Sequence, residues 1–92
     1  MFFSYNKIGE IMRSITYFNN KYKIIDVQDR SMYNNHHLNG AINIPYDELI
    51  NNYRMYLNKN ETYYLYCKSG KLSKRASIIL NYLGYNTIVL EK

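Results

Sequence analysis

The chain has 92 residues, which is enough for one domain over 1–92 and leaves no room for a second. Hydrophobic residues make up 47% of it, but no apolar run approaches the ~20 residues of a membrane span, so we expect no membrane partner. The net charge of +5 suits anionic partners, yet the sequence carries no nucleic-acid-binding motif, and we expect no nucleic acid among them.

Cysteine use indicates the compartment. Cys67 is the single cysteine, so the chain cannot form an internal disulfide. Such a composition is typical of a reducing compartment, and we expect a cytoplasmic protein. The first residues lack the basic region and long apolar core of a signal peptide, which supports the same expectation.

The first half of the chain predicts one helix, one buried strand and a brief extended run. Apolar residues at helical spacing predict a helix over 6–18, with Ile8, Ile11, Met12 and Ile15 on one face. Residues 22–27 predict a short buried strand that ends near Asp26. The polar stretch 28–39 follows, with a helical turn expected near its start, and 40–45 predicts a second extended run.

The second half predicts two helices and two strands. Residues 47–57 predict a helix, 62–66 a strand, 73–83 an amphipathic helix that Gly84 caps, and 87–90 a final strand. Helices that alternate with short apolar strands indicate an α/β fold, with a small, mainly parallel sheet flanked by helices.

The loop that begins at Cys67 is the strongest functional signal. It runs from a strand end to a helix start, where free backbone N–H groups and the helix dipole favour an anion. Four cations at 68, 71, 74 and 75 surround it, which suggests a small anionic substrate. These features should lower the thiol pKa, so we interpret Cys67 as a nucleophile rather than as an inert buried side chain.

Three segments resemble a known family. Ile25-Asp26-Val27 is similar to the strand that opens the core of rhodanese-like domains. The run His37-Leu38-Asn39-Gly40-Ala41-Ile42-Asn43-Ile44-Pro45 resembles that family's His-Ile-Pro-Gly-Ala-Ile-Asn-Ile-Pro signature. Tyr66-Cys67-Lys68-Ser69-Gly70 with Ser73 resembles its active-site loop. The resemblance covers about residues 22–90, and its order and spacing are specific.

The resemblance implies a sulfurtransferase of the thiosulfate type. Cys67 would attack a small anionic sulfur donor, carry the sulfur as a persulfide and pass it to an external thiol or a protein acceptor. The surrounding loop would bind the substrate through Lys68, Ser69, Gly70, Lys71, Leu72 and Ser73. Asp26 and His37 would support neighbouring loops. Neither a metal nor an organic cofactor is implied.

Three departures from the family pattern leave alternatives open. Gln28 and Leu72 stand where many members carry arginine, and the sequence stops after the last strand, so we expect the usual C-terminal helix to be lacking. A non-enzymatic sulfur-carrier or docking module of the same fold is therefore the alternative function. Phosphatase chemistry on this fold would need an arginine six positions after the cysteine, where this chain has Ser73.

Overall fold

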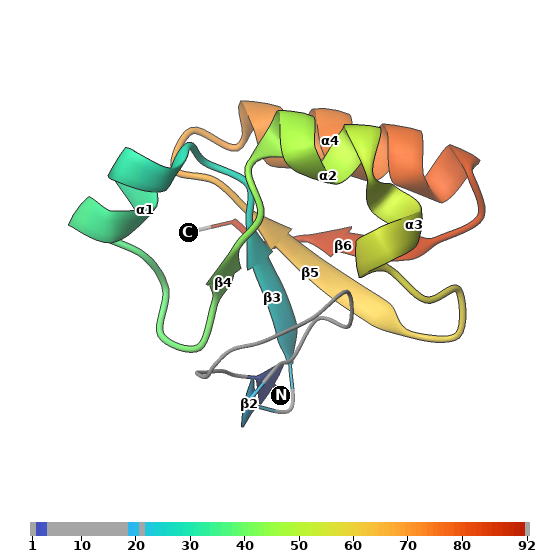
Figure 1. Ribbon diagram of the computed structural model, residues 1–92, viewed down its shortest axis with the longest axis horizontal. Coiled ribbons are helices and arrows are strands. Elements are labelled where there is room, and N and C mark those ends of the chain that lie inside the picture. Colours follow the sequence, from blue (N-terminus) through green and yellow to red (C-terminus); the bar gives the residue numbers. More distant parts are fainter. Residues whose placement is uncertain (1, 4–18, 21, 92) are drawn as a thin grey trace.

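The computed structural model describes residues 2–3, 19–20 and 22–91. The predicted helix over 6–18 lies outside these residues. Four strands form one parallel sheet in the order β4-β3-β5-β6 (Figure 1). Their bounds are β3 Lys23–Asp26, β4 Ile42–Asn43, β5 Thr62–Tyr66 and β6 Asn86–Val89. A separate antiparallel pair joins β1 Phe2–Phe3 to β2 Asn19–Asn20.

In the described part of the chain, four helices accompany the sheet. They are α1 Arg30–Asn35, α2 Tyr46–Asn51, α3 Tyr53–Tyr56 and α4 Lys71–Tyr82. Helix α4 packs against β5 and β6 and also contacts α2, so both helices cover one face of the sheet, whereas α1 lies to the side (Figure 1). This is the α/β arrangement that the alternation of elements predicts.

The helix predicted over 47–57 is in fact two helices. The break lies at Asn52, whose backbone leaves the helical region at φ −136° and ψ 32°. The Asn52 side chain donates a hydrogen bond to the backbone oxygen of Glu48 at 3.1 Å. Asparagine side chains compete in this way for backbone hydrogen-bond partners. The spacing of apolar residues does not show this competition, so it predicted one longer helix.

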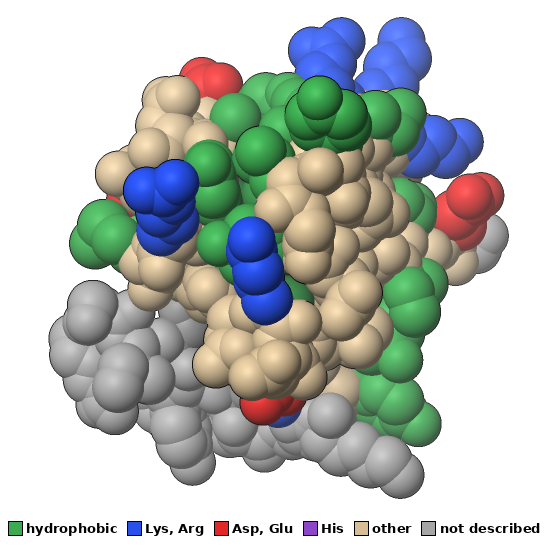
Figure 2. Space-filling model, turned by 90° about the vertical axis from the view of Figure 1, so that its right-hand side faces the viewer, with side chains coloured by type: hydrophobic (Ala, Val, Ile, Leu, Met, Phe, Trp, Pro, Cys, Tyr) green, Lys and Arg blue, Asp and Glu red, His purple; other side chains and the backbone are tan. Residues whose placement is uncertain are grey.

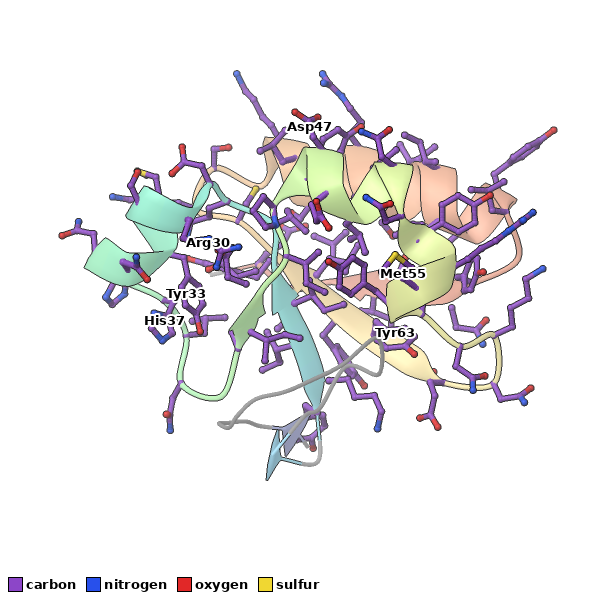
Figure 3. The ribbon with its side chains drawn as sticks, in the orientation of Figure 1. Arg30, Tyr33, His37, Asp47, Met55 and Tyr63 are labelled. Carbon is purple, nitrogen blue, oxygen red and sulfur yellow. The ribbon has the colours of Figure 1, made fainter. Side chains whose placement is uncertain are left out.

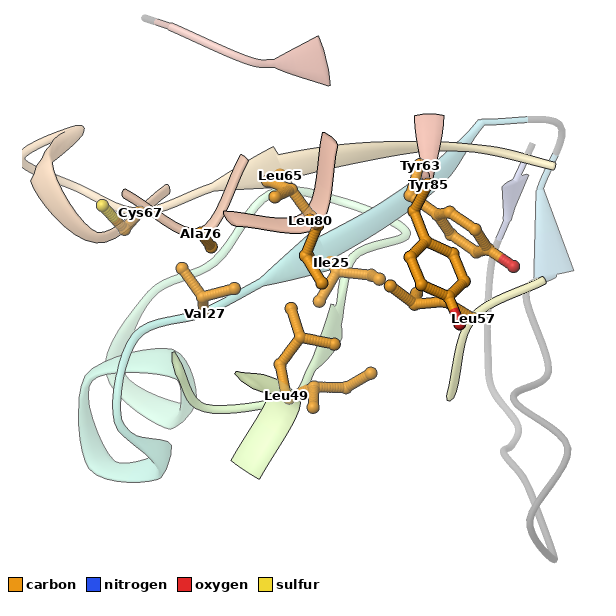
Figure 4. Close-up of a cluster of buried hydrophobic side chains, with 11 residues drawn as sticks. Ile25, Val27, Leu49, Leu57, Tyr63, Leu65, Cys67, Ala76, Leu80 and Tyr85 are labelled. Atoms are coloured by element: carbon orange, nitrogen blue, oxygen red, sulfur yellow. The ribbon is translucent and has the colours of Figure 1, made fainter. Parts of the chain in front are cut away.

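The hydrophobic core lies between the sheet and the helices α2 and α4. Its fully buried members come from β3 and the residue that follows it, from β5 and from both helices: Ile25, Val27, Leu49, Leu65, Ala76 and Leu80. Successive residues of a strand point to opposite faces, so Leu65 and Cys67 share the core face. Cys67 lies at the edge of this cluster, near Val27 and Ala76 (Figure 4).

The last described residues, Leu90 and Glu91, form no helix after β6. No helix in the described part of the chain is long and apolar enough to cross a membrane.

Candidate active site: the Cys67 loop

Gly70 sets the shape of the Cys67 loop. Its φ of +84° lies in the left-handed region, which glycine adopts without steric cost. Helix α4 then begins at Lys71, two residues before the predicted start, because the backbone N–H of Lys74 already donates to the Gly70 carbonyl at 3.1 Å. The earlier start brings the first turn of the helix directly against the cysteine.

Ser73 is the residue that contacts the Cys67 thiol. Its backbone N–H donates to Cys67 Sγ at 3.4 Å, and the thiol donates to Ser73 Oγ at 3.5 Å. Ser73 Oγ in turn donates to the Gly70 carbonyl at 3.2 Å. Cys67 is only 5% exposed and Ser73 is fully buried, so these bonds form away from bulk water.

The loop makes the thiol more acidic than a free cysteine. Burial raises the pKa of Cys67, but hydrogen bonds from the Ser73 hydroxyl and from the N–H groups of Ser73, Gly70 and Leu72 outweigh it. The net effect lowers the pKa of the Cys67 thiol below its ordinary value. The thiolate, which is the nucleophilic form of cysteine, is thereby favoured.

The other predicted loop residues do not contact the thiol through their side chains. Lys68 and Lys71 are exposed, and neither forms an ion pair with an acidic side chain in the described part of the chain. Ser69 Oγ accepts the N–H of Lys71 at 3.2 Å, which closes the loop turn. The Leu72 side chain packs against the hydrophobic core, and the Leu72 backbone N–H donates a hydrogen bond that lowers the pKa of the Cys67 thiol.

Asp26 lies on the opposite face of the sheet and does not contact the thiol. It is fully buried between Ile25 and Val27, which both point into the core. Gln28 donates its backbone N–H to one carboxylate oxygen at 2.9 Å and its side-chain amide to the other at 2.8 Å. Burial raises the pKa of the Asp26 carboxyl, and these hydrogen bonds offset only part of the shift.

Asn43 is a site-supporting residue that the sequence analysis did not single out. Its amide donates to the backbone oxygens of Asp26 and Gln28, each at 3.0 Å. It thereby fixes the turn in which the chain leaves β3. Val27 next donates to the Tyr66 carbonyl at 2.9 Å, directly before the cysteine. Asn43 stood within the run that resembles the family signature, but nothing in the sequence indicated its hydrogen bonds.

His37 belongs to the loop after α1 and forms no hydrogen bond with Cys67. One ring nitrogen is 2.7 Å from the Tyr33 carbonyl oxygen, and the two rings stack at 3.8 Å (Figure 3). Tyr33 in turn donates to the Ala41 carbonyl at 2.6 Å. These contacts tie the His37 ring to Tyr33, and the supporting role of His37 stays a prediction.

A pocket of about 120 Å³ opens next to the Cys67 loop, beside α1. It is lined by Gln28, Met32, Asn35, His36, Tyr66 and Lys68. Among the residues that the structure describes, no cluster of three or more His, Cys, Asp or Glu side chains could hold a metal ion.

Comparison with known proteins decides the family. The family model described as the rhodanese-like domain matches residues 15–92. This chain belongs to the rhodanese-like domain family. The resemblance drawn from the three sequence segments is therefore confirmed.

Several known proteins are similar to this rhodanese-like domain. The thiosulfate sulfurtransferase PspE of Escherichia coli (strain K12) is 37% identical over 65 residues, which are 70% of this chain. The aligned region is 62% of PspE, so the chain spans less than two thirds of that relative.

Solved structures agree on the fold of this rhodanese-like domain. SSP1007 from Staphylococcus saprophyticus has a TM-score of 0.71 at 32% identity, over 78% of this chain and 71% of the other. A rhodanese-like domain protein from Staphylococcus aureus has a TM-score of 0.67 at 28% identity, over 74% and 66%. The α/β fold with a parallel sheet is thus confirmed.

Proposed function

We propose that this chain is a sulfurtransferase that moves sulfane sulfur through a persulfide on Cys67. With thiosulfate as donor, the Cys67 thiolate attacks the outer sulfur, and a new sulfur–sulfur bond forms. The bond between the two thiosulfate sulfurs breaks, and sulfite leaves with its electron pair. The enzyme then carries Cys67–S–S⁻, and neither a proton nor an external oxidant is needed.

The observation that carries this proposal is the Ser73 N–H aimed at Cys67 Sγ at 3.4 Å, within a loop that lowers the thiol pKa. A lower pKa supplies more thiolate at neutral pH. The N–H groups of Gly70 and Leu72 come from the same loop, and they suit the anionic outer sulfur of a persulfide as well as the thiolate. No metal or organic cofactor takes part.

The second half of the reaction needs an acceptor from outside the chain. An acceptor thiolate attacks the outer sulfur of the persulfide, takes it up as a new persulfide and restores the Cys67 thiolate. Cys67 is the only cysteine of the chain, so no second cysteine of the chain can resolve it. A reducing compartment such as the cytoplasm would supply small thiols and protein thiols for this step.

Lys68 and Lys71 are the cations that would attract an anionic donor. Both side chains are exposed beside the thiol and make no ion pair within the described residues. They act as point charges, whereas an arginine would hold an oxyanion through two parallel hydrogen bonds. We therefore expect weak binding of thiosulfate, with a Michaelis constant that rises with ionic strength.

A sulfur-carrier or docking module without efficient turnover is the second candidate. The low exposure of Cys67, at 5%, favours it, because a shielded thiol would need help to reach a donor. Such a protein would accept sulfur from a partner protein but turn over free thiosulfate poorly.

Thiocyanate formation from thiosulfate and cyanide tests the proposal. We expect multiple turnovers by the wild type and a loss of about a thousandfold or more in Cys67→Ala. Lys59→Gln, in the turn before β5, is the matched control and should keep its activity. Turnover that survives in Cys67→Ala would exclude the cysteine mechanism, and a wild type that loads sulfur without turnover would favour the carrier function.

A further inference from the structure

Helix α4 presents one uninterrupted face to solvent. We call this face the α4 stripe; it consists of Lys71, Lys74, Arg75, Ile78 and Tyr82. Their spacing places all five on one side of the helix. Ala76 and Leu80 are fully buried on the other side. Figure 2, which faces the C-terminal end of α4, shows hydrophobic and basic side chains together along the top of the molecule.

The basic half of the α4 stripe lies at the Cys67 loop. A β-carbon built on Gly70 would be 3.9 Å from Lys74 Cε, so the lysine stem passes over that glycine. The N–H of Gly70 is one of the groups that favour the thiolate. Lys71, Lys74 and Arg75 form no ion pair with any acidic side chain in the described parts of the chain.

This placement of charge does not stabilise the helix. Cations near a helix N-terminus oppose the macrodipole, and no acidic residue stands in the first turn of α4 to compensate. Mutual repulsion among three neighbouring cations adds to the cost. An anionic surface opposite them would offset both effects.

The apolar half of the α4 stripe is unusually exposed. Ile78 is 72% exposed and Tyr82, one turn further on, is 89% exposed. Tyrosine and arginine are enriched among the residues that dominate the binding energy of protein interfaces, and an exposed isoleucine beside them adds apolar area. The two halves together span about 16 Å along the helix, which is far more than a small sulfur donor covers.

We propose that the α4 stripe docks an acidic protein that delivers its acceptor thiol to Cys67. The partner's acidic residues face Lys71, Lys74 and Arg75 beside the thiol, while an apolar patch covers Ile78 and Tyr82. The proposal rests on the proposed sulfur transfer and names the class of acceptor. A lipid surface fits less well, because membrane-surface helices separate basic and apolar residues onto opposite faces, whereas these share one face.

Two short peptides with one cysteine test the proposal. One carries glutamates and a leucine around the cysteine, and the other carries lysines in place of the glutamates. Persulfide-loaded protein is mixed with each, and the sulfur gained by the peptide is followed by mass. We expect transfer to the acidic peptide about tenfold faster at low salt, with the preference falling as salt rises.

Variants locate the effect on the helix. Lys74→Gln/Arg75→Gln should remove most of the preference for the acidic peptide. Ile78→Ser/Tyr82→Ser should slow transfer to that peptide severalfold while leaving persulfide formation and transfer to β-mercaptoethanol unchanged. Lys59→Gln and Met55→Ser are the charge and apolar controls, since Met55 is 53% exposed on α3.

The outcomes separate this inference from the sulfur chemistry. Equal rates for both peptides, with normal transfer to β-mercaptoethanol, would overturn the docking surface and leave sulfur transfer intact. If no persulfide forms, fluorescence anisotropy with cysteine-to-serine peptides still measures binding, and a missing acidic preference there overturns the docking surface alone. Tighter binding to phosphatidylserine vesicles or to RNA than to the acidic peptide would also overturn it.

Discussion

The backbone N–H of Ser73 donates to the Sγ of Cys67 at 3.4 Å, so the first turn of α4 contacts the thiol. Ser73 contributes its hydroxyl to the same sulfur and is fully buried. The hydroxyl can donate only one hydrogen bond, and when Cys67 is a thiol it donates that bond to the Gly70 carbonyl. It can turn that proton toward the sulfur once the thiolate forms.

Ser73→Ala should therefore slow the reaction of Cys67 without preventing it. The variant loses the hydroxyl but keeps the backbone N–H, so the thiol pKa should rise and the rate at pH 7 should fall about fivefold. The rate of alkylation by iodoacetamide measures this directly. Ser69→Ala is the control, because its hydroxyl accepts from Lys71 and does not contact the sulfur. Equal effects of both variants would contradict the assignment.

The pH dependence of alkylation should reveal a lowered thiol pKa in the wild type. The rate follows the thiolate fraction, so it rises with pH and reaches a plateau above the pKa. Because the loop hydrogen bonds lower the pKa of Cys67, we expect the plateau at lower pH than for free cysteine. A midpoint at or above that of free cysteine, measured in the same buffer, would show that burial dominates.

Gly70→Ala should affect both stability and reactivity. The φ of +84° strains any residue with a β-carbon by about 1–2 kcal/mol, although the nearest side-chain atom leaves room for it. Relaxation of the loop would displace N–H groups from the thiolate. Gly84→Ala is the matched control, since its φ is +100° but it lies after α4. Urea unfolding should show a lower free energy of unfolding for both variants, whereas only Gly70→Ala should slow the alkylation of Cys67.

Gln28→Ala should destabilise the fold through Asp26. It removes the 2.8 Å bond to a buried carboxylate oxygen, which costs about 2 kcal/mol. In the Asp26→Asn background the same substitution should cost about half as much, because the partner is neutral. The free energies of unfolding of the four proteins in urea measure this coupling. Equal losses in both backgrounds would mean that Gln28 acts through packing alone.

The sequence predicted most of the fold because local patterns determine it. Short apolar runs between helices with regular apolar spacing indicated the strands of the parallel sheet and the position of the Cys67 loop. The start of α4 was predicted two residues late, because the spacing of apolar residues does not show that the loop ends at Gly70. The break at Asn52 depends on a side-chain hydrogen bond, which spacing does not reveal.

The polar cluster behind the site could not be predicted in the same way. Asp26, Gln28 and Asn43 meet only because β3 and β4 pair in one register, with Asp26 opposite Asn43. Gln28 was noted as a lost arginine, but its two bonds to the Asp26 carboxylate show that it satisfies a buried acid. The roles of Lys68 and Lys71 toward a substrate stay predictions, because both side chains are exposed and neither forms a hydrogen bond to Cys67.

The mass of the intact protein after incubation with thiosulfate tests the central claim most directly. We expect a gain of one sulfur atom, about 32 Da, that a reducing thiol removes and that Cys67→Ala does not show. Lys59→Gln should gain the same mass as the wild type. A folded wild type whose thiol is alkylated readily but which gains no sulfur would contradict the account.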